Sequence, residues 1–308
     1  MNVLSFFLNA TLLALALFTS ACSLPKTLPP QADTSHKISF DDDSFKNQTV
    51  QAHIIALHSF GDNHHAFDHW QVWAKSHGYA LHHYDQRGFG HRGKLGRWYG
   101  SEAMVSDAIS LAERIRGHSD KPIYLMGESM GGAIAILAAV ERPQLFRGLI
   151  LAAPAVREGI LVRYPYNAAL NMVASISPST TASIERDPDN PELISSTAQR
   201  LAHSPHTLRD IRMDTYRGLI RLADLASDQA PKLHIPVLLF YGGQDESVPE
   251  VAIKNLRRHW QGHVTYVYQS EWPHLIFQST AWKSVADTAH EWRHSLDNRG
   301  KLHCRKAC

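Results

Sequence analysis

The segment IYLMGESMGG, residues 123–132, constrains the fold of this chain more than any other. Its first four residues form an apolar run typical of a buried strand, and the residues from Met130 to Val140 are typical of a helix. Between them lies G-x-S-x-G, in which Gly127 and Gly131 let the strand and the helix approach closely at a tight turn. Such a turn holds its serine hydroxyl above the edge of a sheet, so the pattern predicts Ser129 as a nucleophile. The alternative is an ordinary helix N-cap, where serine is common.

Length and composition limit the classes of protein that the chain can belong to. Its 308 residues suffice for one large α/β domain with an insertion, or for two small domains. A hydrophobic content of 44% and a charged content of 19% describe a globular protein with ample core. The net charge of +2 and the lack of a basic run argue against a nucleic-acid partner. Asp62, Asn63, His64, His65 and His69 lack a further ligand that would complete a metal site, so we expect no metal.

The first 21 residues carry no charged side chain and contain an apolar run from Leu12 to Phe18. This run is shorter than the roughly 20 residues that span a membrane. Together with the following T-S-A-C it resembles a bacterial lipoprotein signal, which implies lipidation of Cys22. The resemblance places the chain in the bacterial cell envelope, anchored by lipid to a membrane surface, with the periplasmic side of the outer membrane favoured. An ordinary signal cleaved near Ala21 and an uncleaved anchor are the alternatives.

The remaining cysteines, Cys304 and Cys308, lie close together near the end of the chain. In an oxidising compartment the pair would close a small disulfide loop, and otherwise both are free thiols. Their spacing without other ligands does not indicate a zinc site.

Strands alternate with helices along most of the chain, which predicts a mostly parallel sheet covered by helices on both faces. The alternation stops between residues 155 and 230, where helix formers dominate, and we interpret this segment as a helical cap. A misread continuation of the α/β pattern is the alternative. The predicted organisation is a signal (1–21), a tether (22–37), an α/β core (38–154 and 231–296), the cap (155–230) and a C-terminal tail (297–308). We expect strands at 53–57, 79–84, 123–126, 148–152, 236–241 and 264–268, and helices at 66–77, 102–116, 130–140, 251–260 and 275–295.

A serine hydroxyl needs a neighbouring base, and the base needs a carboxylate that orients it. Asp245 follows the predicted strand at 236–241, and His274 follows the strand at 264–268, so both reach the carboxyl edge of the sheet. We therefore predict His274 as the base and Asp245 as the acid. Asp85 also follows a strand, but we expect it to brace a turn with Arg87. Glu271 lies on the wrong side of the strand to serve as the acid.

An acyl transfer also creates an oxyanion, which preorganised N–H donors must stabilise. One predicted donor is the N–H of Met130, the residue after the nucleophile. The second is the N–H of Phe60, in the loop after the strand at 53–57. The sequence therefore predicts an oxyanion hole between two loops at the same edge of the sheet.

Five pieces of sequence together carry a resemblance to a known family: 58–61, 85–90, 127–132, Asp245 with V-P, and His274. They are similar to the monoacylglycerol lipase and lysophospholipase branch of the α/β-hydrolases, also called the serine aminopeptidase S33 family. One departure is Ser59, which stands where the family has glycine. If that position needs a positive φ, a serine strains the loop.

The resemblance implies an α/β-hydrolase fold with a helical cap, and the order Ser129, Asp245, His274 is the order of this fold's catalytic triad. It also implies a serine esterase that cleaves lipid-like esters, of monoacylglycerol or lysophospholipid type, through an acyl-enzyme without a cofactor. Hydrolysis of an amide or a thioester by the same triad stays open. A non-catalytic envelope binding module on the same scaffold stays open as well.

Overall fold

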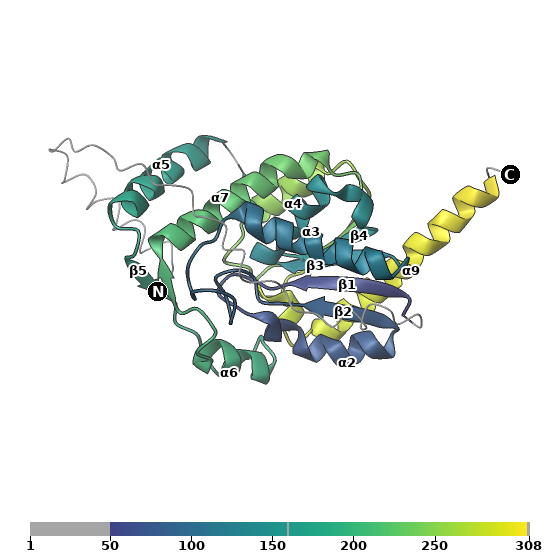
Figure 1. Ribbon diagram of the computed structural model, residues 1–308, viewed down its shortest axis with the longest axis horizontal. Coiled ribbons are helices and arrows are strands. Elements are labelled where there is room, and N and C mark those ends of the chain that lie inside the picture. The colour runs from purple at the N-terminus through teal and green to yellow at the C-terminus, as the bar shows by residue number, and fades with distance from the viewer. Residues whose placement is uncertain (1–49, 159, 307–308) are drawn as a thin grey trace.

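The computed structural model describes residues 50–158 and 160–306 (Figure 1). The predicted signal, the predicted tether and Cys22 lie outside these residues, so lipidation of Cys22 stays a prediction. Cys308 also lies outside them, and the predicted disulfide stays a prediction too.

A six-stranded sheet forms the centre of the described part of the chain, with the strand order β2-β1-β3-β4-β7-β8. Every neighbouring pair in this sheet is parallel, which confirms the mostly parallel sheet expected from the alternation of strands and helices. Parallel strands bring their carboxyl ends, and the loops that follow them, to one edge. The strands are β1 (Ala52–Leu57), β2 (Tyr79–His83), β3 (Ile123–Glu128), β4 (Gly148–Ala152), β7 (Val237–Gly242) and β8 (Val264–Gln269).

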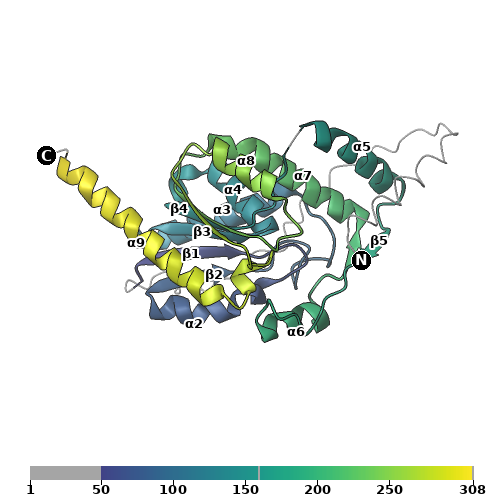
Figure 2. The ribbon, with the colours of Figure 1, turned by 180° about the vertical axis from the view of Figure 1, so that it is seen from behind.

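Helices cover both faces of the sheet, and each face has its own hydrophobic core (Figures 1 and 2). Because side chains alternate along a strand, β1 sends Ile55 and Leu57 into one core and Ile54 and Ala56 into the other. The helices on the first face are α3 (Ser101–His118), α4 (Met130–Glu141), α7 (Met213–Gln229) and α8 (Glu250–His259). Those on the second face are α2 (Asp68–Ser76), which follows the short 3₁₀ helix η2 (His64–Phe67), and α9 (Trp282–Lys306).

The closing helix begins later than the sequence indicates, at Trp282 rather than at residue 275. The residues before it form the short 3₁₀ helix η5 (Ile276–Gln278). Backbone groups of this segment form hydrogen bonds outside a helix. The Phe277 N–H donates to the Glu128 carboxylate, and the main-chain carbonyl of Gln278 accepts the Ile194 N–H. These contacts compete with a regular helix in this segment. Two further 3₁₀ turns are η3 (Pro143–Leu145) and η4 (Ala230–Lys232).

The segment between β4 and β7, called the insertion below, is mainly helical, as expected. It also holds two three-residue strands that pair antiparallel, which sequence reasoning did not predict. No helix among residues 50–158 and 160–306 is both long and apolar enough to cross a membrane. The elements of the insertion are α5 (Ile160–Ile176), β5 (Thr181–Ser183), α6 (Ser195–His203), β6 (Asp210–Arg212), α7 and η4.

Candidate active site

Ser129 occupies a tight turn between β3 and α4, with a φ of 51° that is unusual for a residue other than glycine. A Cβ on Gly127 would lie 2.4 Å from the Gly131 carbonyl oxygen, and one on Gly131 would lie 2.0 Å from the Leu57 carbonyl oxygen. Neither contact is sterically possible, so both positions require glycine for the reason expected from the sequence. The strained backbone conformation persists because the surrounding contacts fix it.

His274 and Asp245 meet at the same edge of the sheet, although 29 residues separate them. The His274 Nδ1 lies 2.8 Å from the Asp245 Oδ2. The other carboxylate oxygen of Asp245 accepts the N–H groups of Ser247 and Val248 at 2.7 and 2.9 Å, which fixes the carboxylate in place. Nδ1 therefore donates to Asp245, and Nε2 is left to accept a proton.

Several effects act on the pKa of His274. Burial lowers this pKa, but the charge and hydrogen bond of Asp245 and the charge of Glu128 raise it by more, so that it lies above its ordinary value. A raised pKa makes the imidazole a stronger base. The structure thus brings together two of the three residues predicted for the triad. Among the described residues no hydrogen bond joins the Ser129 hydroxyl to His274. Such bonds are often long before substrate binds.

The loop after β1 carries Phe60, whose N–H is the second predicted oxyanion donor. Neither this N–H nor that of Met130 donates to any acceptor within the described residues. His58 fixes the peptide before Phe60, because its Nδ1 donates to the Ser59 carbonyl at 2.8 Å while its Nε2 accepts the Gln86 N–H at 3.0 Å. In a trans peptide the C=O and N–H point in opposite directions, so the Phe60 N–H faces away from His58.

Ser59 does not strain this loop. Within residues 50–158 and 160–306, the residues other than glycine with a positive φ are Ser129 and Ala153. The left-handed conformation in the loop falls on Gly61, with a φ of 78°. The strain considered for a serine at position 59 is therefore absent, since that position does not need glycine.

Glu128, which precedes the nucleophile, is a site residue that sequence reasoning missed. Its side chain is fully buried, and this burial raises its pKa to about 7. One carboxylate oxygen accepts the Phe277 N–H at 2.8 Å, and the other accepts the Gln278 side-chain amide at 2.9 Å. Glu128 therefore holds the segment that follows His274 against the end of β3, next to Ser129. A charged residue inside an otherwise apolar strand-to-turn segment is the signal that could have revealed it.

The same network extends to the insertion. The Gln278 side-chain amide also donates to Asp62 at 3.0 Å. Arg200 of α6 pairs with Asp62 and donates to the Gln278 side-chain oxygen, Oε1. Burial raises the pKa of Asp62, but the charge and hydrogen bond of Arg200 lower it by more, so that it lies below its ordinary value. One connected set of buried polar groups thus links the nucleophile turn, the oxyanion loop, the histidine loop and α6.

Asp85 braces a turn, as expected, but not with Arg87. One of its oxygens accepts from the backbone and ring of His64, and the other accepts the His91 N–H. Arg87 instead forms two hydrogen bonds with Asp107 of α3, at 2.8 and 2.9 Å. The predicted partner is wrong because a bidentate carboxylate on the neighbouring helix attracts the guanidinium more strongly.

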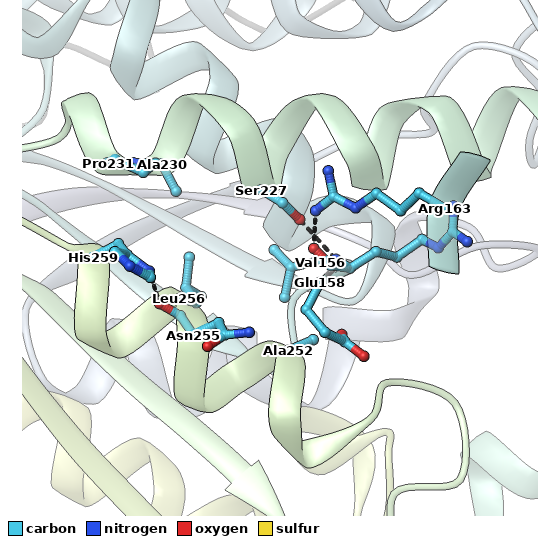
Figure 3. Close-up of a pocket in the computed structure, with 11 residues that line it drawn as sticks. Val156, Glu158, Arg163, Ser227, Ala230, Pro231, Ala252, Asn255, Leu256 and His259 are labelled. Carbon is cyan, nitrogen blue, oxygen red and sulfur yellow. Dashed lines mark hydrogen bonds between the residues drawn. The ribbon is translucent and has the colours of Figure 1, made fainter. Parts of the chain in front are cut away.

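Two cavities formed by the described residues are candidates for the substrate site. One, of about 400 Å³, is lined by His274 and by residues of the insertion. The other, of about 210 Å³, lies between α7 and α8 (Figure 3). Arg163 forms ion pairs with Asp224 and Asp228 at this cavity, and the Ser227 hydroxyl accepts the Arg157 N–H. None of the predicted catalytic residues lines this second cavity, so the cavity beside His274 is the candidate substrate site.

Comparisons with known proteins agree with this architecture. Residues 48–280 match the model of the family described as serine aminopeptidase, S33. Human monoglyceride lipase is 28% identical over 166 residues, which cover 49% of this chain and 52% of that protein. Mouse monoglyceride lipase is 45% identical over 56 residues, or 18% of each chain. The chain thus matches about half the length of its human relative and less of the mouse protein.

Solved structures show the same fold. The monoacylglycerol lipase of Paleococcus ferrophilus superimposes with a TM-score of 0.68 at 21% identity, covering 80% of this chain and 96% of that one. A soluble variant of the monoglyceride lipase of Saccharomyces cerevisiae also gives 0.68, at 17% identity, covering 82% and 88%. With the family match over most of the described residues, these findings establish that the chain belongs to the serine aminopeptidase S33 family and has the α/β-hydrolase fold.

Proposed function

We propose that the protein hydrolyses carboxylic esters with a lipid-like acyl or glycerol part through a Ser129–His274–Asp245 triad. The observation that carries the proposal is the His274–Asp245 hydrogen bond at the edge of a cavity, on the same sheet edge as the strained turn of Ser129. The monoglyceride lipase relatives support a lipid ester as the substrate. A monoacylglycerol agrees with their names, and a lysophospholipid is the other type that the family resemblance implies.

In the proposed reaction the Ser129 hydroxyl attacks the ester carbonyl carbon while His274 Nε2 takes its proton. The oxyanion accepts hydrogen bonds from the N–H groups of Phe60 and Met130. As the tetrahedral intermediate collapses, the bond to the alcohol breaks, and His274 gives its proton to the departing alcohol oxygen. Water, deprotonated by His274, then attacks the acyl carbon. The bond between that carbon and Ser129 Oγ breaks, His274 returns the proton to Oγ, and the acid is released. Asp245 keeps the imidazole oriented and stabilises its charged form.

A panel of acyl-matched p-nitrophenyl esters, monoacylglycerols and lysophospholipids tests the proposal. We expect hydrolysis that prefers apolar acyl groups, and we expect Ser129→Ala and His274→Ala each to lower kcat by about 10⁴-fold or more. Ser284→Ala is the matched control, because this exposed serine of α9 does not line the cavity. Equal activity of the wild type and Ser129→Ala would contradict the proposal.

A second candidate is hydrolysis of an amide that carries a free amino terminus. Glu185 and Asp187, which lie in the insertion, line the cavity beside His274 and provide negative charge that would attract an ammonium group. Aminoacyl amides in the same panel separate the two candidates. Faster hydrolysis of these amides than of any apolar ester would favour the aminopeptidase.

We further propose that Cys22 is lipidated and tethers the enzyme to a membrane surface of the bacterial envelope. The support is the resemblance of the first 22 residues to a lipoprotein signal. Expression of the full chain and of Cys22→Ser in a bacterium with two membranes, fed a labelled fatty acid, tests this. We expect Cys22→Ser to lose both the fatty-acid label and its place in the outer-membrane fraction. Label retained by the variant would contradict the proposed lipidation of Cys22.

A further inference from the structure

Arg186 presents its guanidinium group close to the proposed reaction centre. It lies between β5 and α6 and lines the cavity that His274 also lines. A Cβ built on Gly61 of the oxyanion loop would lie 3.7 Å from the Arg186 Nη2, so the guanidinium reaches the loop that carries Phe60. Its position therefore places a positive charge between the two loops that would handle the scissile ester.

This charge has no partner among residues 50–158 and 160–306. The Arg186 Nε is buried without a hydrogen-bond acceptor, and no carboxylate in the described part of the chain forms an ion pair with the guanidinium. The nearby Asp62 is already neutralised by Arg200 and bound by Gln278. Burial lowers the pKa of Arg186, although an arginine stays charged in proteins. A half-buried cation without an anionic partner is costly unless a ligand supplies the anion.

Carboxylates surround the same cavity nearer to solvent. Glu185, Asp187, Glu192 and Glu246 all line it and are all exposed. The cavity thus combines one inner positive charge with an outer ring of negative charge. A simple polyanion would be repelled by that ring, and a neutral glycerol would leave the inner cation unpaired. A ligand with a phosphate near the ester and an ammonium group further out satisfies both.

The position of His274 tells which part of the substrate enters this cavity. In the proposed mechanism His274 protonates the departing alcohol, so the alcohol part of the ester lies on its side. The charged groups must then belong to the leaving alcohol rather than to the acyl chain. An arginine fork is well suited to a phosphate because it can form two parallel hydrogen bonds with it.

We infer that Arg186 is a specificity-determining residue that binds the phosphate of a zwitterionic lysophospholipid, while the carboxylate ring receives its ammonium group. The substrate class is then lysophosphatidylethanolamine or lysophosphatidylcholine, and the alcohol released is the glycerophospho-amine. This inference rests on the proposed ester hydrolysis and narrows its substrate.

The test compares four substrates with one acyl chain, presented in identical mixed micelles: a monoacylglycerol, a lysophosphatidic acid, and the two zwitterionic lysophospholipids. The zwitterions should give the highest kcat/KM of the four in the wild type. Arg186→Gln should lower it on the zwitterions by about ten- to hundredfold, mainly through KM, because a charge-assisted contact is lost. The ratio of its kcat/KM on the zwitterions to its kcat/KM on the monoacylglycerol should fall by a similar factor. Arg186→Lys should keep part of the preference.

Arg209→Gln is the matched control, since this exposed arginine of the insertion does not line the cavity. A double change Glu185→Gln and Glu246→Gln should reduce the preference for zwitterions over lysophosphatidic acid. Inhibition by glycerophosphoethanolamine, measured with a p-nitrophenyl ester, gives a second readout that should weaken in Arg186→Lys.

The outcomes separate the inference from the function on which it rests. If Arg186→Gln slows monoacylglycerol and lysophospholipid hydrolysis equally, Arg186 does not recognise a phosphate, although ester hydrolysis stands. A wild type that prefers the monoacylglycerol overturns the inference in the same way. Failure of the wild type to hydrolyse any ester would refute the proposed function and, with it, this inference.

Discussion

Replacing Glu128 with glutamine should change how the stability of the protein depends on pH. The carboxyl group is buried beside the nucleophile, and its pKa rises from 4.5 to about 7. Between these values the native state holds a proton that the unfolded state has released. The free energy of unfolding of the wild type therefore falls as the pH rises through this window. A shift of this size corresponds to about 3 kcal/mol.

The glutamine variant carries no ionisable group at this position, so its free energy of unfolding does not fall in this way as the pH rises. In the wild type, N–H groups of Phe277 and Gln278 donate to the two carboxylate oxygens of Glu128. In the variant, the N–H₂ of the new amide faces one of these two donors and cannot accept from it. That conflict costs about 1–3 kcal/mol at any pH. Relative to the wild type, the variant should therefore gain about 3 kcal/mol between pH 4.5 and pH 8.

Urea unfolding of both proteins at pH 4.5, 6 and 8 measures this difference. Titration of the groups that do not interact with Glu128 is common to the two proteins and cancels, as does the constant cost of the amide. A stability difference that stays the same within about 0.5 kcal/mol across the three pH values would refute the reasoning, since Glu128 would then titrate as in the unfolded chain.

Three further predictions concern single side chains. His53 and His82 share a buried hydrogen bond, and burial lowers their pKa values to about 4 and 3, so the free energy of unfolding should fall as the pH drops from about 6.5 to 4. Urea titrations at several pH values should show that His82→Gln has a weaker dependence of unfolding free energy on pH, and an unchanged dependence would contradict the lowered pKa of His82. Because position 59 does not need a positive φ, Ser59→Gly should keep kcat within about twofold and lose up to about 1 kcal/mol of stability, whereas a large rise in kcat would show that the serine distorts the loop. Gly131→Ala should lower the free energy of unfolding by at least about 3 kcal/mol, because the new Cβ would collide with a main-chain carbonyl of β1. Gly117→Ala, whose Cβ would meet nothing within 4 Å, should leave the stability unchanged or raise it. Thermal unfolding measures both, and similar stabilities of the two variants would be inconsistent with this packing.

The sequence predicted those features that depend on short segments. Gly127 and Gly131 indicate the nucleophile turn because the requirements of such a turn are local, and the mostly parallel sheet follows from the alternation of strands and helices. His274 and Asp245 could be expected at one edge because both follow strands of a parallel sheet. Their hydrogen bond confirms that the two loops converge.

What the sequence did not predict depends on contacts between distant residues. Glu128 binds partners 149 and 150 residues away, and Arg200 reaches Asp62 across 138. No local pattern specifies which buried polar groups will satisfy one another. The misassigned partner of Asp85 and the late start of α9 have the same cause, since tertiary contacts outweighed local preference at Arg87 and at Phe277.

The central claim is that His274 and Asp245 activate the hydroxyl of Ser129. Reaction with a fluorophosphonate, followed by mass spectrometry of the digested protein, tests it most directly. We predict a single phosphonyl adduct on Ser129 in the wild type, no adduct in Ser129→Ala, and labelling slowed by about 10³-fold or more in His274→Ala. A folded wild-type protein that takes up no label, or a label that remains in Ser129→Ala, would contradict the account.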